Sequence, residues 1–296
     1  MSGSTVYQIV TDEIIKKLEG GTVPWHQPWK SHGAARNLIS GKAYRGINSF
    51  LLSCSPFSSL FWLTFNQADG LGGHVRKGEH SSMAVFFKQW EIEKESPETG
   101  ETVEVKIPIL RYYRVFNADQ CEGINHKRLA ELQTFSASNN FNPIEQADSV
   151  IANMPNCPAM KEEGSRAFYR PSTDTVTMPP RGLFDSPETF YSTLFHELAH
   201  ATGHASRLNR KGIMEHHFFG DQDYGQEELV AEMGAAFLTG HCGISQPLID
   251  NQASYIASWL KTIRKDAKLV VVAAAQAQKA ADFILGKGES DHETAL

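Results

Sequence analysis

The chain has 296 residues, of which 41% are hydrophobic and 21% are charged, and its formal net charge is −6. This composition is typical of a soluble globular protein with enough residues for two ordinary domains. The four cysteines form no Cys-x-x-Cys pair, which argues against a disulfide scaffold or a cysteine-based zinc module and fits a reducing cytoplasm.

The start of the chain predicts a helix and no targeting signal. Residues 1–21 lack the basic start, apolar centre and small-residue cleavage site of a secretory signal. Their apolar positions follow the period of an amphipathic helix. No apolar stretch elsewhere reaches the length of a membrane span. We therefore expect a cytoplasmic protein without a membrane partner.

The next segments predict a β-hairpin and an uneven charge distribution. Residues 81–94 and 101–117 are strand-like and flank the polar turn ESPETG. Through Arg128 the chain has 15 Lys and Arg against 13 Asp and Glu, and the remainder has 13 against 21. The acidic residues of the first half cluster at 91–105, so the rest of that half is basic, as a nucleic-acid surface needs. Residues 134–143 are polar and turn-rich and are the predicted linker.

Aromatic and basic side chains gather in loop-like parts of the first half. Aromatic faces that stack on bases, and cations that contact phosphates, are how proteins hold single-stranded nucleic acid. The predicted DNA contacts are Trp25, Trp29, Lys30, Tyr44, Arg45, Arg76 and Lys77. The alternative, burial in a core, stays open for Trp25 and Trp29. Burial is favoured for Trp62, Phe65, Phe86 and Phe87.

The second half mixes helices with short strands. Residues 142–154 predict a helix, and residues 166–179 predict two strands around a turn. Further helices are predicted at 187–202, at 226–239 and, as one long helix or a broken pair, at 250–285. Residues 287–296 have too little apolar surface to fold alone and are predicted to be a disordered tail.

The stretch FHELAH, residues 195–200, carries an HExxH motif on a predicted helix that starts at the capping residue Ser186. His196 and His200 are four positions apart, so their rings share one helix face and can converge on one metal ion. Glu197 lies beside them, where it can take a proton from metal-bound water. The spacing therefore predicts the metal site of a hydrolase.

A catalytic zinc site takes three protein ligands and keeps a position for water. The third ligand is expected from residues 225–240, which offer Glu227, Glu228 and Glu232. Glu228 and Glu232 are four positions apart and would repel each other without a nearby cation. We favour Glu228 as ligand and Glu232 as the carboxylate that accepts a hydrogen bond from a ligand histidine. The reverse assignment stays open.

Zn²⁺ is the predicted ion, with Mn²⁺ and Co²⁺ as alternatives, because two imidazoles and one carboxylate accept all three. His204 is a rival ligand, but it lies beyond Gly203, where the motif helix is predicted to end. His216 and His217 fall in a predicted loop and are weaker candidates.

Segments from both halves resemble one known family. STLFHELAHATGHASRLNR and YGQEELVAEMGAAFL are similar to the zincin-like domain of plasmid ArdC antirestriction proteins and of their TraC-type relatives from conjugative plasmids. TVPWHQPW, YRGINSFLL and RYYRVFNADQCEG are similar to the N-terminal domain of the same family. The resemblance covers nearly the whole chain.

The resemblance implies an α+β fold of two domains. A domain that binds single-stranded DNA would span residues 1–133, and a zincin-like metalloprotease domain would span residues 144–286. The resemblance also implies that the protein protects incoming plasmid DNA from host restriction during conjugation, with DNA and the host restriction machinery as partners.

The same resemblance assigns roles to individual residues. His196 and His200 match the family's metal histidines, Glu197 matches its catalytic glutamate, and Glu228 takes the position of the third ligand. Most such enzymes carry aspartate at the supporting position, where this sequence has Glu232.

Three functions compete at this point. The chain is a DNA-binding antirestriction protein, a metallopeptidase whose first half recognises a protein substrate, or a binding module with a purely structural metal. Glu197 argues against the third, because a structural site needs no base beside its ligands. Residues 174–179 are a candidate strand for holding an extended peptide, with an internal strand of the sheet as the equal alternative.

Overall fold

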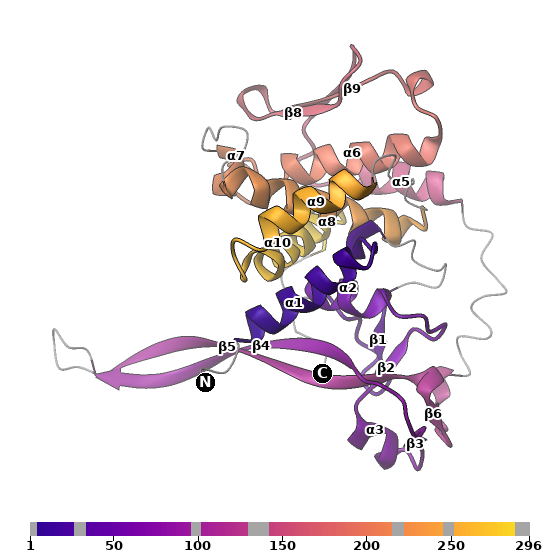
Figure 1. The fold of residues 1–296 in the computed structure, drawn as a ribbon. Helices are drawn as coiled ribbons and strands as arrows, with labels where there is room; N and C mark the ends of the chain where they lie inside the picture. Colours follow the sequence, from indigo (N-terminus) through magenta and orange to yellow (C-terminus); the bar gives the residue numbers. More distant parts are fainter. Residues whose placement is uncertain are drawn as a thin grey trace.

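The computed structural model describes residues 5–26, 34–95, 102–129, 142–214, 222–244 and 252–287. These residues form the predicted α+β fold, with a long two-stranded ribbon in the first half and a layer of helices in the second (Figure 1). Most of the predicted linker and nearly all of the predicted tail lie outside the described residues.

The first half places short helices on a small mixed sheet. Its helices are α1 (Val6–Glu19), η1 (Pro24–His26), α2 (Ile47–Ser53), α3 (Phe65–Gly70) and η2 (Ala118–Gln120). Its strands are β1 (Arg36–Asn37), β2 (Phe61–Leu63), β3 (His74–Val75), β4 (Ser82–Glu95), β5 (Thr102–Asn117) and β6 (Cys121–Glu122). The larger sheet has the order β1-β2-β5-β4, and β3 pairs with β6. The predicted N-terminal helix is confirmed as α1, capped by Thr5.

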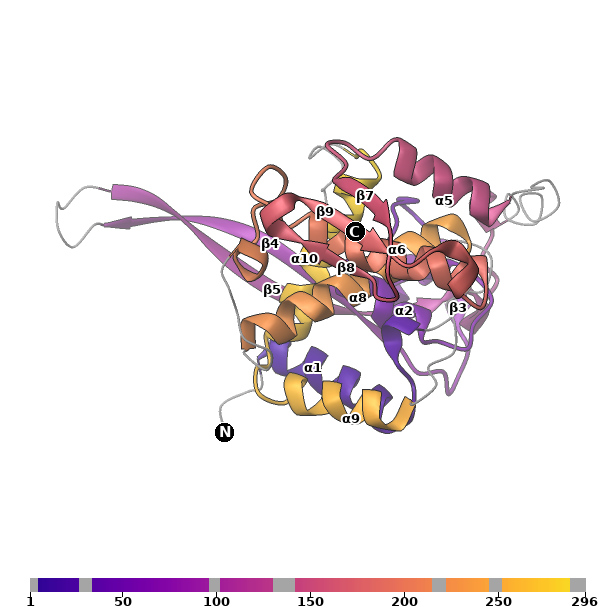
Figure 2. The ribbon, with the colours of Figure 1, turned by 90° about the horizontal axis from the view of Figure 1, so that it is seen from above.

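The predicted hairpin is confirmed as β4 and β5, which pair antiparallel from Ser82 and Val115 out to Glu95 and Thr102. Its base lies beside α1 and α2, and its far end projects from the body of the molecule (Figures 1 and 2). Residues 91–95 and 102–105 of the acidic segment belong to this outer part. The acidic positions on these strand ends are thus held away from the body of the molecule (Figure 1).

The second half is built mainly of helices. They are α5 (Pro143–Ala152), η3 (Pro171–Thr173), η4 (Arg181–Leu183), α6 (Pro187–Ala201), α7 (Lys211–Met214), α8 (Gln222–Cys242), α9 (Gln252–Ile263) and α10 (Leu269–Ile284). The predicted segment 250–285 is therefore a broken pair. Among the described residues, none of the helices has the length and apolar character needed to cross a bilayer.

A three-stranded sheet in the order β7-β9-β8 covers α6, with strands β7 (Ala159–Glu162), β8 (Phe168–Arg170) and β9 (Thr175–Met178). β9 pairs with β7 on one side and with β8 on the other. The prediction that residues 174–179 hold a peptide is therefore wrong, because both edges of β9 are already paired. The edge strands of this sheet are β7 and β8.

The two halves share a hydrophobic core. Val10 and Ile14 of α1, together with Trp25, pack in one cluster with Leu229 of α8 and Val270 of α10. Buried polar contacts cross the same boundary. α1 and Trp25 would lose these partners if the halves were separated, so experiments on the first half need the full chain.

Candidate metal centre

Helix α6 positions the HExxH motif. The Ser186 side chain accepts a hydrogen bond from the Thr189 backbone N–H at 3.2 Å, as a helix cap does. The apolar face of α6, which includes Leu194 and Leu198, is buried in a second core with α5, β9 and the end of α8. This anchoring fixes the helix rotation and leaves the histidine face directed toward α8.

His196 and His200 lie on that face with their Nε2 atoms 3.1 Å apart. Glu228 of α8 brings one carboxylate oxygen to 3.7 Å from His196 Nε2 and the other to 3.6 Å from His200 Nε2. The structure thus brings together the residues predicted as ligands, and their donor atoms all lie within 4.8 Å of one another.

Close packing of α6 on α8 makes this approach possible. A Cβ atom at Gly234 of α8 would lie 3.0 Å from the Cβ atom of Ala199, tighter than ordinary side-chain contacts. Two small residues therefore allow the helix axes to come close enough for Glu228 to reach across.

The donor spacing fits a divalent cation. Two ligands of a tetrahedral ion at about 2.1 Å from each donor lie about 3.4 Å apart. The three separations between the donor atoms, from 3.1 to 3.7 Å, bracket this value. Burial, together with the neighbouring His200, lowers the pKa of His196 to about 4, which keeps its ring in the neutral form that binds metals.

Glu227, rather than Glu232, lies beside the second ring nitrogen of a ligand histidine. Its Oε1 atom lies 3.4 Å from His200 Nδ1 and accepts a hydrogen bond from Arg210 at 2.6 Å, and its Oε2 atom accepts a second one from Arg210 at 3.0 Å. Burial acts to raise the pKa of Glu227, but the contacts with His200 and Arg210 outweigh it, and the pKa is lowered. The prediction for Glu232 is wrong because that residue lies one turn beyond Glu228 and contacts His26 instead.

His26 was missed by the sequence reasoning, which took no notice of the histidine in the PWHQPW stretch. The residue ends η1, and its Nε2 atom lies 3.2 Å from Glu232 Oε2. His26 also lowers the pKa of His196, but by less than burial and the neighbouring His200 do. The first half therefore contributes a side chain to the surroundings of the metal site. No local sequence signal links residues that are so far apart.

Glu197 is buried beside the histidines, with 8% of its surface exposed. Burial raises the pKa of its carboxyl group, whereas the nearby His200 and a backbone hydrogen bond from Tyr169 act to lower it. Tyr169 belongs to β8, so the edge strand holds the glutamate in place. A carboxyl group with a raised pKa suits a general base that works near neutral pH.

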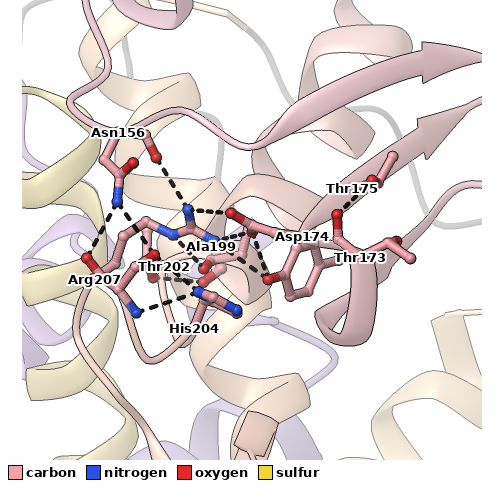
Figure 3. Close-up of polar contacts among 11 residues, drawn as sticks. Asn156, Thr173, Asp174, Thr175, Ala199, Thr202, His204 and Arg207 are labelled. Atoms are coloured by element: carbon pink, nitrogen blue, oxygen red, sulfur yellow. Dashed lines mark hydrogen bonds and ion pairs between the residues drawn. The ribbon is translucent and has the colours of Figure 1, made fainter.

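Arg207 ties the β8–β9 turn to the end of α6 (Figure 3). It donates hydrogen bonds to the Ala201 carbonyl at 2.8 Å, to the Asn156 carbonyl at 3.0 Å and to Asp174 Oδ2 at 3.0 Å. The Asp174 carboxylate also accepts a hydrogen bond from the Tyr169 hydroxyl at 2.8 Å. Arg207 therefore fixes the strand that holds Glu197.

The rival histidines do not join the site in the described residues. His204 lies near Ser206, with its Nδ1 atom 2.8 Å from the hydroxyl oxygen. It is absent from the group of metal donors formed by the residues that the structure describes. His216 and His217 lie outside the described residues.

Two of the predicted DNA contacts are core residues. Trp25 is 1% exposed, packs edge-on against Trp259 and donates a hydrogen bond from Nε1 to the Tyr255 hydroxyl at 3.1 Å. Tyr44 is buried in a small cluster with Trp62. Neither Trp25 nor Tyr44 offers a ring face to a base, so their prediction as stacking residues is wrong.

Two of the other predicted DNA contacts are paired with carboxylates. Arg45 forms an ion pair with Asp282, and Arg76 pairs with Glu79 at 2.7 Å. Lys77 is exposed, and Trp29 and Lys30 lie outside the described residues.

Of the aromatic residues predicted to be buried, Trp62 is buried and Phe86 is half-buried. Phe65 is 56% exposed, so the prediction was wrong for it. As the first residue of α3, it follows the capping residue Thr64 and points to solvent. The structure describes the backbone of Phe87 but not its side chain.

Both halves match known protein families. Residues 4–116 match the N-terminal domain of anti-restriction factor ArdC, and residues 145–276 match a zincin-like metallopeptidase. The chain is also similar to solved structures of the antirestriction ArdC protein from the R388 plasmid. The metal-free crystal structure is 37% identical with a TM-score of 0.72, over 94% of this chain and 96% of that chain. The Mn(II)-bound structure is 34% identical with a TM-score of 0.74, over 98% and 99% of the two chains.

Three further proteins are similar to this chain in sequence. Two DNA primases TraC of Escherichia coli are each 34% identical over 94% of this chain. The chain spans only 20% and 27% of their lengths. The uncharacterized protein y4eC of Sinorhizobium fredii is 31% identical over 94% of this chain and 91% of its own length.

Proposed function

Because the chain belongs to the ArdC family of antirestriction proteins, we propose that it binds single-stranded DNA and protects incoming conjugative plasmid DNA from host restriction. Its second half is a zincin-like metallopeptidase domain. We propose that this domain cleaves protein, with the host restriction machinery as the expected target.

The observation that carries the peptidase proposal is the convergence of His196, His200 and Glu228 beside the buried Glu197. Two histidines and one glutamate are the ligand set of several zinc peptidases. When bound, a divalent cation acts as a Lewis acid and lowers the pKa of a coordinated water. Glu197 serves as the general base and returns the proton to the leaving amine.

The surrounding residues support this assignment. Glu227 and Arg210 hold the His200 ring through its second nitrogen, and the backbone N–H of Tyr169 holds Glu197. Such outer contacts fix ligand orientation in metal sites. The donor set is typical of Zn²⁺, whereas the similar R388 protein is described as Mn(II)-bound. Zn²⁺ and Mn²⁺ are therefore the two ions to test.

The variant Glu197→Gln tests the peptidase proposal. We expect it to bind Zn²⁺ or Mn²⁺ with wild-type affinity in calorimetry and to lose at least about 100-fold in the rate of casein cleavage. Glu188→Gln makes the same change in the first turn of α6 and serves as the matched control. Equal cleavage rates for Glu197→Gln and the wild type would contradict the proposal.

The DNA-binding proposal is supported by the surface of the first half. The exposed side chains include the rings of Phe65 and Tyr112 and the cations Lys77 and Arg114. The described part of the acidic segment, residues 91–95 and 102–105, lies on the outer part of the ribbon, so it does not oppose an approaching phosphate backbone at the body of the molecule (Figure 1). Exposed rings and cations on one body are the requirements for holding a single strand.

Fluorescence anisotropy with the full chain and a labelled 20-nucleotide single strand tests this proposal. We expect binding that weakens with rising salt, because phosphate contacts release counterions. The absence of binding at low salt would contradict it.

A second candidate function is a metallopeptidase whose first half recognises a protein substrate. The contact of His26 with Glu232 favours it, because it places the first half at the metal site. A chain that cleaves protein but binds no single strand would support this candidate over the first.

A further inference from the structure

A hollow of about 350 Å³ lies between α1 and the base of the β4–β5 ribbon. Its volume is at the lower end of the range of about 300–1,000 Å³ in which small-molecule pockets fall. It is far too small for a duplex but suits one nucleotide. The side chains around it include Glu13, Lys17, Leu51, Met83, Tyr112 and Arg114.

The local geometry explains why these side chains meet. Ile9, Glu13 and Lys17 follow one another at intervals of four and therefore share one face of α1. On the ribbon, Tyr112 and Arg114 are two positions apart and point to the same face of the sheet. Their neighbours Arg111 and Tyr113 point to the opposite face.

The hollow combines an apolar floor with an aromatic wall. Leu51 of α2 is 6% exposed, and Met83 lies opposite Arg114 on β4. Tyr112 is 41% exposed, so its ring remains accessible from solvent. An accessible ring beside an apolar floor suits the flat face of a nucleobase.

The charges of the hollow suit a phosphate. Lys17 and Arg114 are its cations and Glu13 its carboxylate, so the side chains around it carry a net charge of +1. Within the part of the chain that the structure describes, neither Lys17 nor Arg114 forms an ion pair. Arg45 and Arg76, which were predicted to contact DNA, are instead paired with carboxylates.

We propose that this hollow binds one nucleotide of single-stranded DNA, with Tyr112 stacked on the base and Lys17 and Arg114 in contact with the flanking phosphates. This inference rests on the proposed DNA-binding function and locates it on the face formed by α1 and the ribbon.

Paired variants on opposite faces of β5 test the stacking contact. In the full chain, Tyr112→Leu removes the aromatic face while keeping apolar bulk, and we expect it to weaken binding of a dT20 oligonucleotide about tenfold or more. Tyr113→Leu makes the same change one residue away on the other face and is expected to stay within about twofold of the wild type. Melting curves of both variants report on folding.

The cations are tested in the same way. Arg114→Gln should reduce the slope of log affinity against log salt by about 0.7, the value for one phosphate contact of a single strand. Lys17→Gln should have the same effect, whereas Arg111→Gln should leave the slope unchanged.

Two outcomes separate the failure of the hollow from the failure of the function. If the wild-type chain binds no single strand, the proposed DNA-binding function fails and the hollow fails with it. If the wild-type chain binds and folded Tyr112→Leu and Tyr113→Leu bind equally well, only the hollow is overturned.

Discussion

His26 Nε2 lies 3.2 Å from Glu232 Oε2, although the two residues are 206 positions apart in the chain. Glu232 is one turn of α8 away from the predicted ligand Glu228. Hydrogen bonding also links Glu232 to Tyr255 of α9, whose hydroxyl accepts from Trp25. The first half of the chain thus packs directly against α8, the helix that carries Glu228.

Removal of this contact is expected to weaken the attachment between the halves. His26→Ala should lower the free energy of unfolding by about 1 kcal/mol, the usual net contribution of a partly buried hydrogen bond. Urea denaturation of the full chain measures this. His74→Ala is the control, because His74 pairs with Glu122 only at the surface and should change stability by less than about 0.5 kcal/mol. Equal losses in the two variants would argue against a specific contact between the halves.

The roles of Glu227 and Glu232 lead to opposite expectations for metal binding. Glu227→Gln should weaken Mn²⁺ or Zn²⁺ binding about 10- to 100-fold, because the carboxylate that orients His200 is lost. Glu232→Gln should have a clearly smaller effect. Calorimetry at a temperature where both variants are folded measures the two affinities. A larger loss in Glu232→Gln than in Glu227→Gln would reinstate the role that the sequence pattern assigned to Glu232.

The sequence predicted what depends on local rules. The cap at Ser186 and the four-residue spacing of His196 and His200 are properties of one helix, and they needed no knowledge of the fold. The alternation of the ribbon strands and the turn between them likewise predicted the β4–β5 hairpin.

The sequence could not predict what depends on tertiary packing. Glu227 and Glu232 are both carboxylates on the same helix, and only the positions of Arg210 and His26 decide which one faces His200. Trp25 lies in a proline-flanked loop-like stretch that suggested exposure. Its burial depends on Trp259, which is in the other half of the chain.

The Arg207–Asp174 pair should make stability depend on pH in the acid range. The hydrogen bond from Arg207 lowers the pKa of Asp174, burial opposes this shift, and the Tyr169 hydroxyl adds to the lowering. A lowered folded-state pKa means that the stabilisation is present above the unfolded-state pKa of about 3.9 and is lost as the pH falls through the folded-state value.

Asp174→Asn tests this dependence. Asparagine tolerates the left-handed backbone of this position, where φ is 45°. At neutral pH the variant should be less stable than the wild type by about 1.5 kcal/mol, the low end for a charged hydrogen bond. The difference should shrink as the pH is lowered below about 4. Urea titrations at several pH values measure it, and a difference that stays constant down to pH 2 would contradict the assigned role of the pair.

Gly203→Ala tests the close packing behind the metal helix. Helix α6 ends at Ala201, close to the predicted end at Gly203. The backbone of Gly203 is not left-handed, so the glycine is needed because a larger side chain would not fit. An added Cβ atom would lie 2.5 Å from Ile213 Cγ1 and 3.1 Å from an Arg210 guanidinium nitrogen.

We expect this substitution to cost about 1–3 kcal/mol of stability through overpacking. It should also weaken metal binding, because a displaced Arg210 no longer holds Glu227 against His200. Gly182→Ala is the matched control, since a Cβ atom there meets no atom within 4 Å. Thermal melting and calorimetry with Mn²⁺ compare the two variants. If Gly203→Ala lost stability but kept full metal affinity, Arg210 would have no part in orienting the ligand histidine.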